Sequence, residues 1–198
     1  MAKTNHKLMN AETLIGPAIS VAGRKLRLFS LYVDFAAAVR ARWATSHVVQ
    51  LAGGQWKAST EMWNLDSLTT SEPIRKMIIR DAADADVLIV AASSLDRRET
   101  ELVWWLDDVA AVKTVRPAAG LFIGLLGDEH DRAGELDWTV KQFLRCSGAL
   151  DRDFIWRWMD REATENDDWL TDSVAALLAR KHPAPDTIFW PETAVGAV

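Results

Sequence analysis

The chain has 198 residues, of which 49% are hydrophobic and 26% are charged, and its formal net charge is -5. A chain of this length forms one domain by default and builds a core easily. The apolar fraction and the low net charge exclude a largely disordered protein. The single cysteine, Cys146, excludes a disulfide framework and a cysteine-rich zinc site. The excess of acidic over basic residues argues against binding to nucleic acid.

Neither a membrane span nor a secretory signal is predicted. The longest mostly uncharged run, residues 115–126, is interrupted by Arg116 and is too short to cross a bilayer. The stretch that would form the apolar part of a signal peptide contains Glu12 and Pro17. We therefore expect a cytoplasmic protein that binds neither membrane nor nucleic acid, with residues 1–24 as a partly disordered N-terminal tail.

From Lys25 onward, apolar runs alternate with amphipathic segments. The predicted strands are residues 26–33, 56–63, 87–92, 121–126 and 154–159. The predicted helices that follow them are residues 35–51, 71–83, 97–113, 136–148 and 169–181. The second strand alternates imperfectly between apolar and polar residues, which is typical of a sheet edge.

This strict alternation predicts an α/β fold, in which helices cover both faces of a parallel sheet. Five strand–helix units fit the flavodoxin-like order 2-1-3-4-5 best, so we expect a three-layer, doubly wound, five-stranded parallel sheet. The domain would span residues 25–182, and the proline-containing C-terminal tail, residues 183–198, would pack against it.

Ligands of such folds bind at the carboxyl ends of the strands. Asp34 begins the turn after the first predicted strand and is the predicted N-cap of the helix that follows. This turn has no glycine or hydroxyl group that could hold a phosphate. Neither a GxGxxG nor a Walker sequence occurs in the chain. The sequence therefore predicts no nucleotide cofactor bound in the usual way.

The order of elements resembles the receiver domains of two-component signalling, over roughly residues 25–181. A receiver carries an acidic pair after its first strand and a phosphate-accepting aspartate after its third. Here Asp34 stands alone, and Ser93 and Ser94 follow the third strand, so aspartyl phosphorylation is excluded at that position. The resemblance implies a receiver-like module without phospho-acceptor, a non-catalytic signalling or protein-interaction domain.

Three short strings carry a second resemblance. With Trp63, Ala85-Asp86 and Trp105-Leu106, the chain is also similar to a set of stand-alone bacterial proteins of unknown function. That resemblance implies no activity.

An enzyme similar to TIR domains or deoxyribosyltransferases is the alternative. Those folds place a glutamate after a central strand, where it attacks or stabilises a ribosyl carbon. The residues nearest such chemistry would be Asp34, Ser93, Ser94 and Glu101. Glutamate on an exposed helix face is ordinary, so the sequence favours a protein that is not an enzyme.

A metal site is the other candidate at this edge. Asp128, His130 and Asp131 carry ligand atoms that suit Mg²⁺, Mn²⁺ or Zn²⁺. Neighbouring residues of one loop rarely converge on one ion, so a solvated loop is favoured and no metal is predicted. Cys146 lies on an apolar stretch near a helix end, which favours a buried structural thiol over a nucleophile.

The ten tryptophans are the unusual feature of the composition. Trp105 lies on the apolar face of its predicted helix, whereas Trp104 is turned by about 100 degrees from it. Exposed tryptophan favours partner binding. We therefore expect Trp104, Trp158 and Trp190 as interface residues toward a protein partner or a second copy in a homodimer, unless helices cover them.

Overall fold

The computed structural model describes residues 24–92, 98–112, 120–127, 136–158 and 168–181. The strands are β1 (Arg24–Tyr32), β2 (Trp56–Asn64), β3 (Val87–Ala92), β4 (Gly120–Leu126) and β5 (Arg152–Trp158). The helices are α1 (Phe35–Ala52), α2 (Glu72–Asp84), α3 (Glu99–Ala111), α4 (Leu136–Ala149) and α5 (Asp168–Lys181). Two 3₁₀ turns, Gly53–Gln55 and Leu65–Thr69, stand before and after β2.

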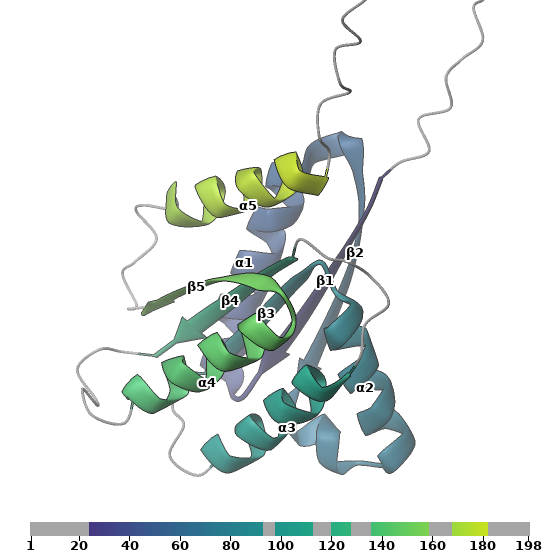
Figure 1. Cartoon of the computed structure of the whole chain (residues 1–198). Helices are drawn as coiled ribbons and strands as arrows, with labels where there is room; N and C mark the ends of the chain where they lie inside the picture. Colours follow the sequence, from purple (N-terminus) through teal and green to yellow (C-terminus); the bar gives the residue numbers. More distant parts are fainter. Residues whose placement is uncertain (1–23, 93–97, 113–119, 128–135, 159–167, 182–198) are drawn as a thin grey trace, which may run out of the picture.

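The strands form one parallel sheet in the order β2-β1-β3-β4-β5. Helices α1 and α5 cover one face of this sheet, and α2, α3 and α4 cover the other (Figure 1). The predicted three-layer, doubly wound fold is therefore confirmed, and β2 lies at a sheet edge as its imperfect alternation predicts. Strands β3 and β4 are buried along their whole length, because helices cover them on both faces.

Small side chains on its inner face let α1 lie close to the sheet. The residues buried on its inner face are Ala37, Ala41, Ala44, Thr45, Val48 and Ala52. They recur at the spacing of one helix face, so an almost continuous row of methyl groups meets β1 and β3. The Thr45 hydroxyl lies 2.9 Å from the hydroxyl of Ser30 on β1, which satisfies both buried groups.

Aromatic rings fill the opposite layer. Trp105 of α3 is almost fully buried and stacks on Phe29 of β1, with the ring centroids 6.1 Å apart. Phe122, Phe143 and Phe154 form a second group of rings with centroids 5.4 to 6.3 Å apart. Such tilted and edge-to-face contacts add to the free energy that the buried area supplies.

Gly124 lets the rings approach the sheet. A Cβ atom at Gly124 would lie 2.9 Å from the ring of Phe143 and 3.2 Å from the Cβ of Trp156. Any side chain would therefore push α4 or β5 away from the middle of β4.

A buried arginine connects the amino edge of the sheet to α2. Arg152, the first residue of β5, is only 7% exposed and donates hydrogen bonds to the carbonyl oxygens of Ala82, Ala83 and Ala85. These carbonyls end α2, where no further turn of helix supplies donors. Burial lowers the pKa of Arg152 to about 10. Because Arg152 and Asp153 belong to β5, this strand begins two residues before its predicted start.

No helix in the described ranges is long and apolar enough to cross a bilayer. The predicted N-terminal and C-terminal tails lie almost wholly outside the described residues, and their boundaries stay predictions.

Candidate functional site

The topology creates a switch point at the carboxyl edge of the sheet. From β1 the chain enters α1 on one face, and from the neighbouring β3 it runs to α3 on the other face (Figure 1). Ligands of open α/β sheets bind where two such connections part. The residues at this place are therefore the candidate site, which we call the carboxyl-edge site: Val33, Asp34, Phe35, Asn64, Asp66, Arg98 and Glu101.

Asp34 caps the first helix. Its backbone is extended, and its Oδ1 accepts a hydrogen bond from the Ala37 amide at 2.8 Å. A carboxylate at this position also interacts favourably with the positive end of the helix dipole. The N-cap role predicted for Asp34 is confirmed.

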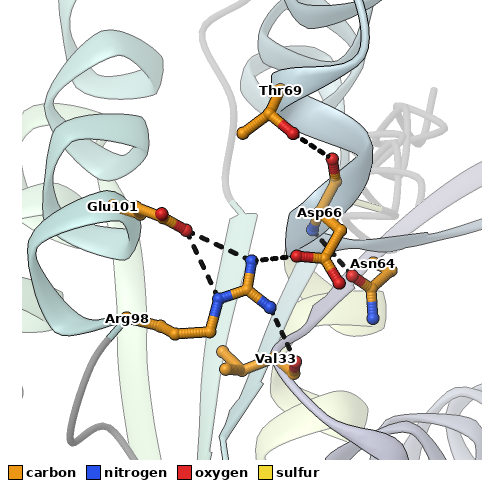
Figure 2. Close-up of polar contacts among 6 residues, drawn as sticks. All are labelled: Val33, Asn64, Asp66, Thr69, Arg98 and Glu101. Carbon is orange, nitrogen blue, oxygen red and sulfur yellow. Dashed lines mark hydrogen bonds and ion pairs between the residues drawn. The ribbon is translucent and has the colours of Figure 1, made fainter.

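Arg98 lies at the centre of the carboxyl-edge site (Figure 2). Its Nη2 lies 2.5 Å from an Asp66 carboxylate oxygen, and its Nε and Nη2 donate to one oxygen of Glu101 at 3.3 and 3.2 Å. Its Nη1 donates to the carbonyl oxygen of Val33 at 3.4 Å. One guanidinium therefore connects the ends of β1 and β2 with the first turn of α3.

The electrostatics keep Arg98 charged. Burial lowers the pKa of Arg98, but the hydrogen bonds and charges of Asp66 and Glu101 raise it by more, so the net shift is upward. The Arg98 side chain is 25% exposed, whereas that of Asp66 is 73% exposed. A cation that two carboxylates already hold is a poor anion site, unless an incoming group displaces one of them.

The 3₁₀ turn after β2 holds Asp66 in place (Figure 2). The Asn64 side-chain oxygen accepts a hydrogen bond from the Asp66 amide at 2.7 Å, and the Thr69 hydroxyl donates to the Asp66 carbonyl at 2.8 Å. These short-range bonds are typical of Asx and related turns. They present the Asp66 carboxylate toward α3.

Sequence reasoning did not single out Arg98. The sequence feature that could have indicated it is its position directly before the helix that follows the central strand β3. This position lies at the same edge of the sheet as the ends of β1 and β2. Arg98 and Val33 are 65 residues apart in the chain, so only the strand order places them together.

Six other predicted site residues lie outside the described residues, and their roles stay predictions: Ser93, Ser94, Asp128, His130, Asp131 and Trp190. Among the residues that are described, no three His, Cys, Asp or Glu side chains gather as a metal site would require. Glu101 contacts Arg98, as shown above.

The predicted interface tryptophans differ in exposure. Trp104 is 62% exposed, in line with its displacement from the apolar face of α3. Trp158 is half-buried against the α2–α4 layer and meets the ring of Trp156 edge to face. Their role as an interface stays a prediction.

Cys146 is a structural thiol, as the sequence predicts. It is 2% exposed and donates weakly to the carbonyl oxygen of Leu106 at 3.5 Å. Burial raises its pKa to about 12, so it is neither a thiolate nor a nucleophile at neutral pH.

No protein-family model and no curated protein sequence matches this chain. Several solved structures share its fold. A flavodoxin of Streptococcus pneumoniae TIGR4 superposes with a TM-score of 0.51 at 17% identity, over 79% of this chain and 99% of the flavodoxin. A short-chain flavodoxin associated with a PDU bacterial microcompartment gives 0.52 at 16% identity, over 79% and 99% of the two chains. The apo form of an NADH:FMN oxidoreductase gives 0.53 at 17% identity, over 82% and 93%.

These comparisons correct the functional expectation. The predicted receiver-like, non-catalytic signalling or interaction module is wrong, because these similar structures are two flavodoxins and an NADH:FMN oxidoreductase. The expectation that the protein is not an enzyme is corrected with it, and so is the alternative of a TIR-like or deoxyribosyltransferase-like enzyme. Receiver domains and flavodoxins share the order 2-1-3-4-5, so element order alone does not separate them.

An FMN phosphate does not fit the described part of the site in the usual manner. A phosphate at the start of α1 would need free amides and small or hydroxylic residues. Residues 33–38 contain no glycine, serine or threonine, and the Ala37 amide is already bonded to Asp34. The carboxylate of Asp34 would also repel a phosphate at that position.

Proposed function

We propose that this protein is a redox protein that binds a flavin, or a planar ring of similar chemistry, at its carboxyl-edge site. The observation that carries the proposal is the strand order, which the chain shares with two flavodoxins and an NADH:FMN oxidoreductase over about four fifths of its length. In folds of this order the flavin lies at the β1/β3 switch point. A cytoplasmic location belongs to this proposal.

The aromatic side chain of Phe35 supports a planar ligand. Phe35 is the first residue of α1 and is 85% exposed, although apolar rings of this size are usually buried. It follows Asp34 directly at the switch point, where a ligand ring would bury it by stacking. The large exposed ring and its place at the edge are explained together by such a ligand.

The charges favour a ligand without a phosphate at this edge. Asp34, Asp66 and Glu101 are carboxylates, whereas Arg98 is the cation bonded to the latter two. A neutral flavin such as riboflavin avoids the repulsion that an FMN phosphate would meet beside Asp34. The proposed ligand is therefore held by its ring and not by a phosphate on α1.

Titration of the purified full chain with riboflavin and with FMN tests this proposal through quenching of flavin fluorescence. We expect riboflavin to bind at least about tenfold more tightly than FMN, a difference of about 1.4 kcal/mol. Tighter binding of FMN would contradict the expected repulsion between the Asp34 carboxylate and the phosphate. Failure of both flavins to bind at millimolar concentration would contradict the flavin proposal itself.

Two variants locate the site. Phe35→Ala removes the exposed ring and should weaken riboflavin binding at least about fivefold without lowering the thermal midpoint. Val39→Ala is the matched control, because Val39 lies one turn further along α1 and is also exposed, at 56%. Equal effects of the two changes would place the ligand elsewhere.

A further inference from the structure

Strand β2 is a long, regular edge of the sheet. It pairs with β1 over nine consecutive residues without a bulge, and no other strand of the described ranges lies on its outer side. Residues 59–62 are exposed. Natural edge strands are blunted by bulges, prolines, short length or charged side chains. Strand β2 has no bulge and no proline and is nine residues long, so its charges, Lys57 and Glu61, are the features that select its partner.

The sequence of β2 is self-complementary when read antiparallel. Centred on Ser59, an antiparallel pair of two copies sets Lys57 opposite Glu61 and Trp56 opposite Met62. Opposite residues of antiparallel strands point to the same face, so each pair is in contact distance. The two-fold symmetry produces each of these contacts twice.

The faces that β2 presents agree with this register. Glu61 pairs in register with Phe29 of β1, so it lies on the face that α2 covers. Neither Lys57 nor Glu61 forms an ion pair within the described part of the chain. Burial and the neighbouring charge of Glu61 raise the pKa of Asp81 on α2. Arg27 and Arg80 act in the opposite direction on Asp81, and Lys57 of a second copy would add a further positive charge beside Glu61.

On the other face of the sheet, β2 and α1 each contribute an exposed apolar side chain. A groove of about 590 Å³ runs between α1 and β2. Met62 and Val49 line it and are 38% and 36% exposed. In the antiparallel register, Trp56 of a second copy would lie against Met62 and cover one end of this groove.

We propose that two copies of this chain pair edge to edge through β2, antiparallel and centred on Ser59, so that their two sheets become continuous. The occupant of this edge is a second copy because the strand complements itself in charge and in apolar pairs. The inference does not depend on the proposed redox function.

Charge exchange tests the register in the full chain by sedimentation velocity and light scattering over about 5 to 200 µM. We expect a dimer for the unaltered chain. Lys57→Glu and Glu61→Lys should each weaken it at least about tenfold, since each sets like charges opposite one another twice. The double variant Lys57→Glu/Glu61→Lys should restore the dimer. Circular dichroism and thermal unfolding show whether each variant remains folded.

A disulfide test reports the pairing directly. Ser59→Cys in a Cys146→Ala background should give a covalent dimer on mild oxidation, because the two Ser59 positions face each other across the axis. Lys76→Cys, exposed on α2, is the control and should stay monomeric. A monomer at all concentrations would overturn the proposal, as would a dimer that both single charge variants leave intact. Failure of the double variant to restore pairing would overturn the register.

Discussion

The Nη2 of Arg152 donates a hydrogen bond to the carbonyl oxygen of Ala85 at 2.7 Å and also reaches the carbonyls of Ala82 and Ala83. Through this one group the first residue of β5 caps the C-terminal end of α2, which lies about 70 residues earlier in the chain. Among the described residues, the Nε and Nη1 of Arg152 have no hydrogen-bond partner. The buried cation therefore serves the helix end.

Replacing Arg152 by methionine should destabilise the fold. Arg152→Met keeps the apolar stem but removes the side-chain donor to the carbonyls at the end of α2, so we expect a loss of about 2–4 kcal/mol in the free energy of unfolding. Urea denaturation measures this change. Arg180→Met is the control, because Arg180 forms an exposed ion pair with Asp153 and should cost less than about 1 kcal/mol. Similar losses in both variants would contradict the capping role.

Glycine positions in β4 and α4 give a matched pair. Gly124→Ala should cost about 1–3 kcal/mol, because the new methyl group would overlap the ring of Phe143. Gly148→Ala should be neutral or stabilising by up to about 1 kcal/mol, since nothing lies within 4 Å of its Cβ position in the helix. Chemical denaturation distinguishes the two, and a stable Gly124→Ala protein would show that α4 can move away from the sheet.

The buried thiol of Cys146 should make stability fall in alkaline solution. An unfolded thiol ionises near pH 8.5, whereas the native thiol keeps its proton up to about 12. Between these values the native state binds more protons, so its stability decreases by roughly 1 kcal/mol per pH unit relative to a Cys146→Ala variant. Urea midpoints at pH 7.5 and 9.5 measure the difference. A thiol reagent should label Cys146 at pH 8 only after unfolding, and rapid labelling of the native protein would contradict its burial.

Two adjacent tryptophans should contribute very different amounts to the free energy of unfolding. Trp105→Ala removes a buried ring that stacks on Phe29 and should cost about 3–5 kcal/mol. Trp104→Ala changes an exposed side chain and should alter stability by less than about 0.5 kcal/mol. Thermal unfolding compares the two. Equal costs would mean that α3 is rotated about its axis.

Helix capping gives one further test at the carboxyl edge. Asp34→Ala removes the oxygen that accepts from the Ala37 amide and should cost about 0.5–2 kcal/mol. Asp34→Ser should keep most of this stability, because its hydroxyl oxygen can cap in the same way. The serine variant should also narrow the preference for riboflavin over FMN, since it removes the negative charge. An unchanged preference would mean that the phosphate does not approach α1.

The sequence predicts the sheet well where burial on both faces leaves an unmistakable pattern. Val87–Ala92 is predicted residue for residue, because an uninterrupted apolar run bounded by polar residues has one simple interpretation. The start of β5 is missed because Arg152 and Asp153 are charged. The burial of Arg152 depends on carbonyls of α2, which local sequence does not reveal.

The carboxyl-edge site is predicted only where its contacts are local. Asp34 is recognised as a cap because its partner is three residues away. Arg98 is missed because its contacts to Val33 and Asp66 depend on the strand order. In the sequence it stands beside Arg97 in a short charged run, which is otherwise typical of a solvated surface. The functional class is missed for a related reason, because flavodoxins and receiver domains share the order of elements.

The alanines on the inner face of α1 limit which substitutions this helix can accept. A larger side chain at Ala37, Ala41 or Ala44 has no neighbour that can shrink in compensation, so it would lift α1 from the sheet and carry Phe35 with it. Substitutions in α1 should therefore spare these alanines, which keep Phe35 in its place at the carboxyl-edge site.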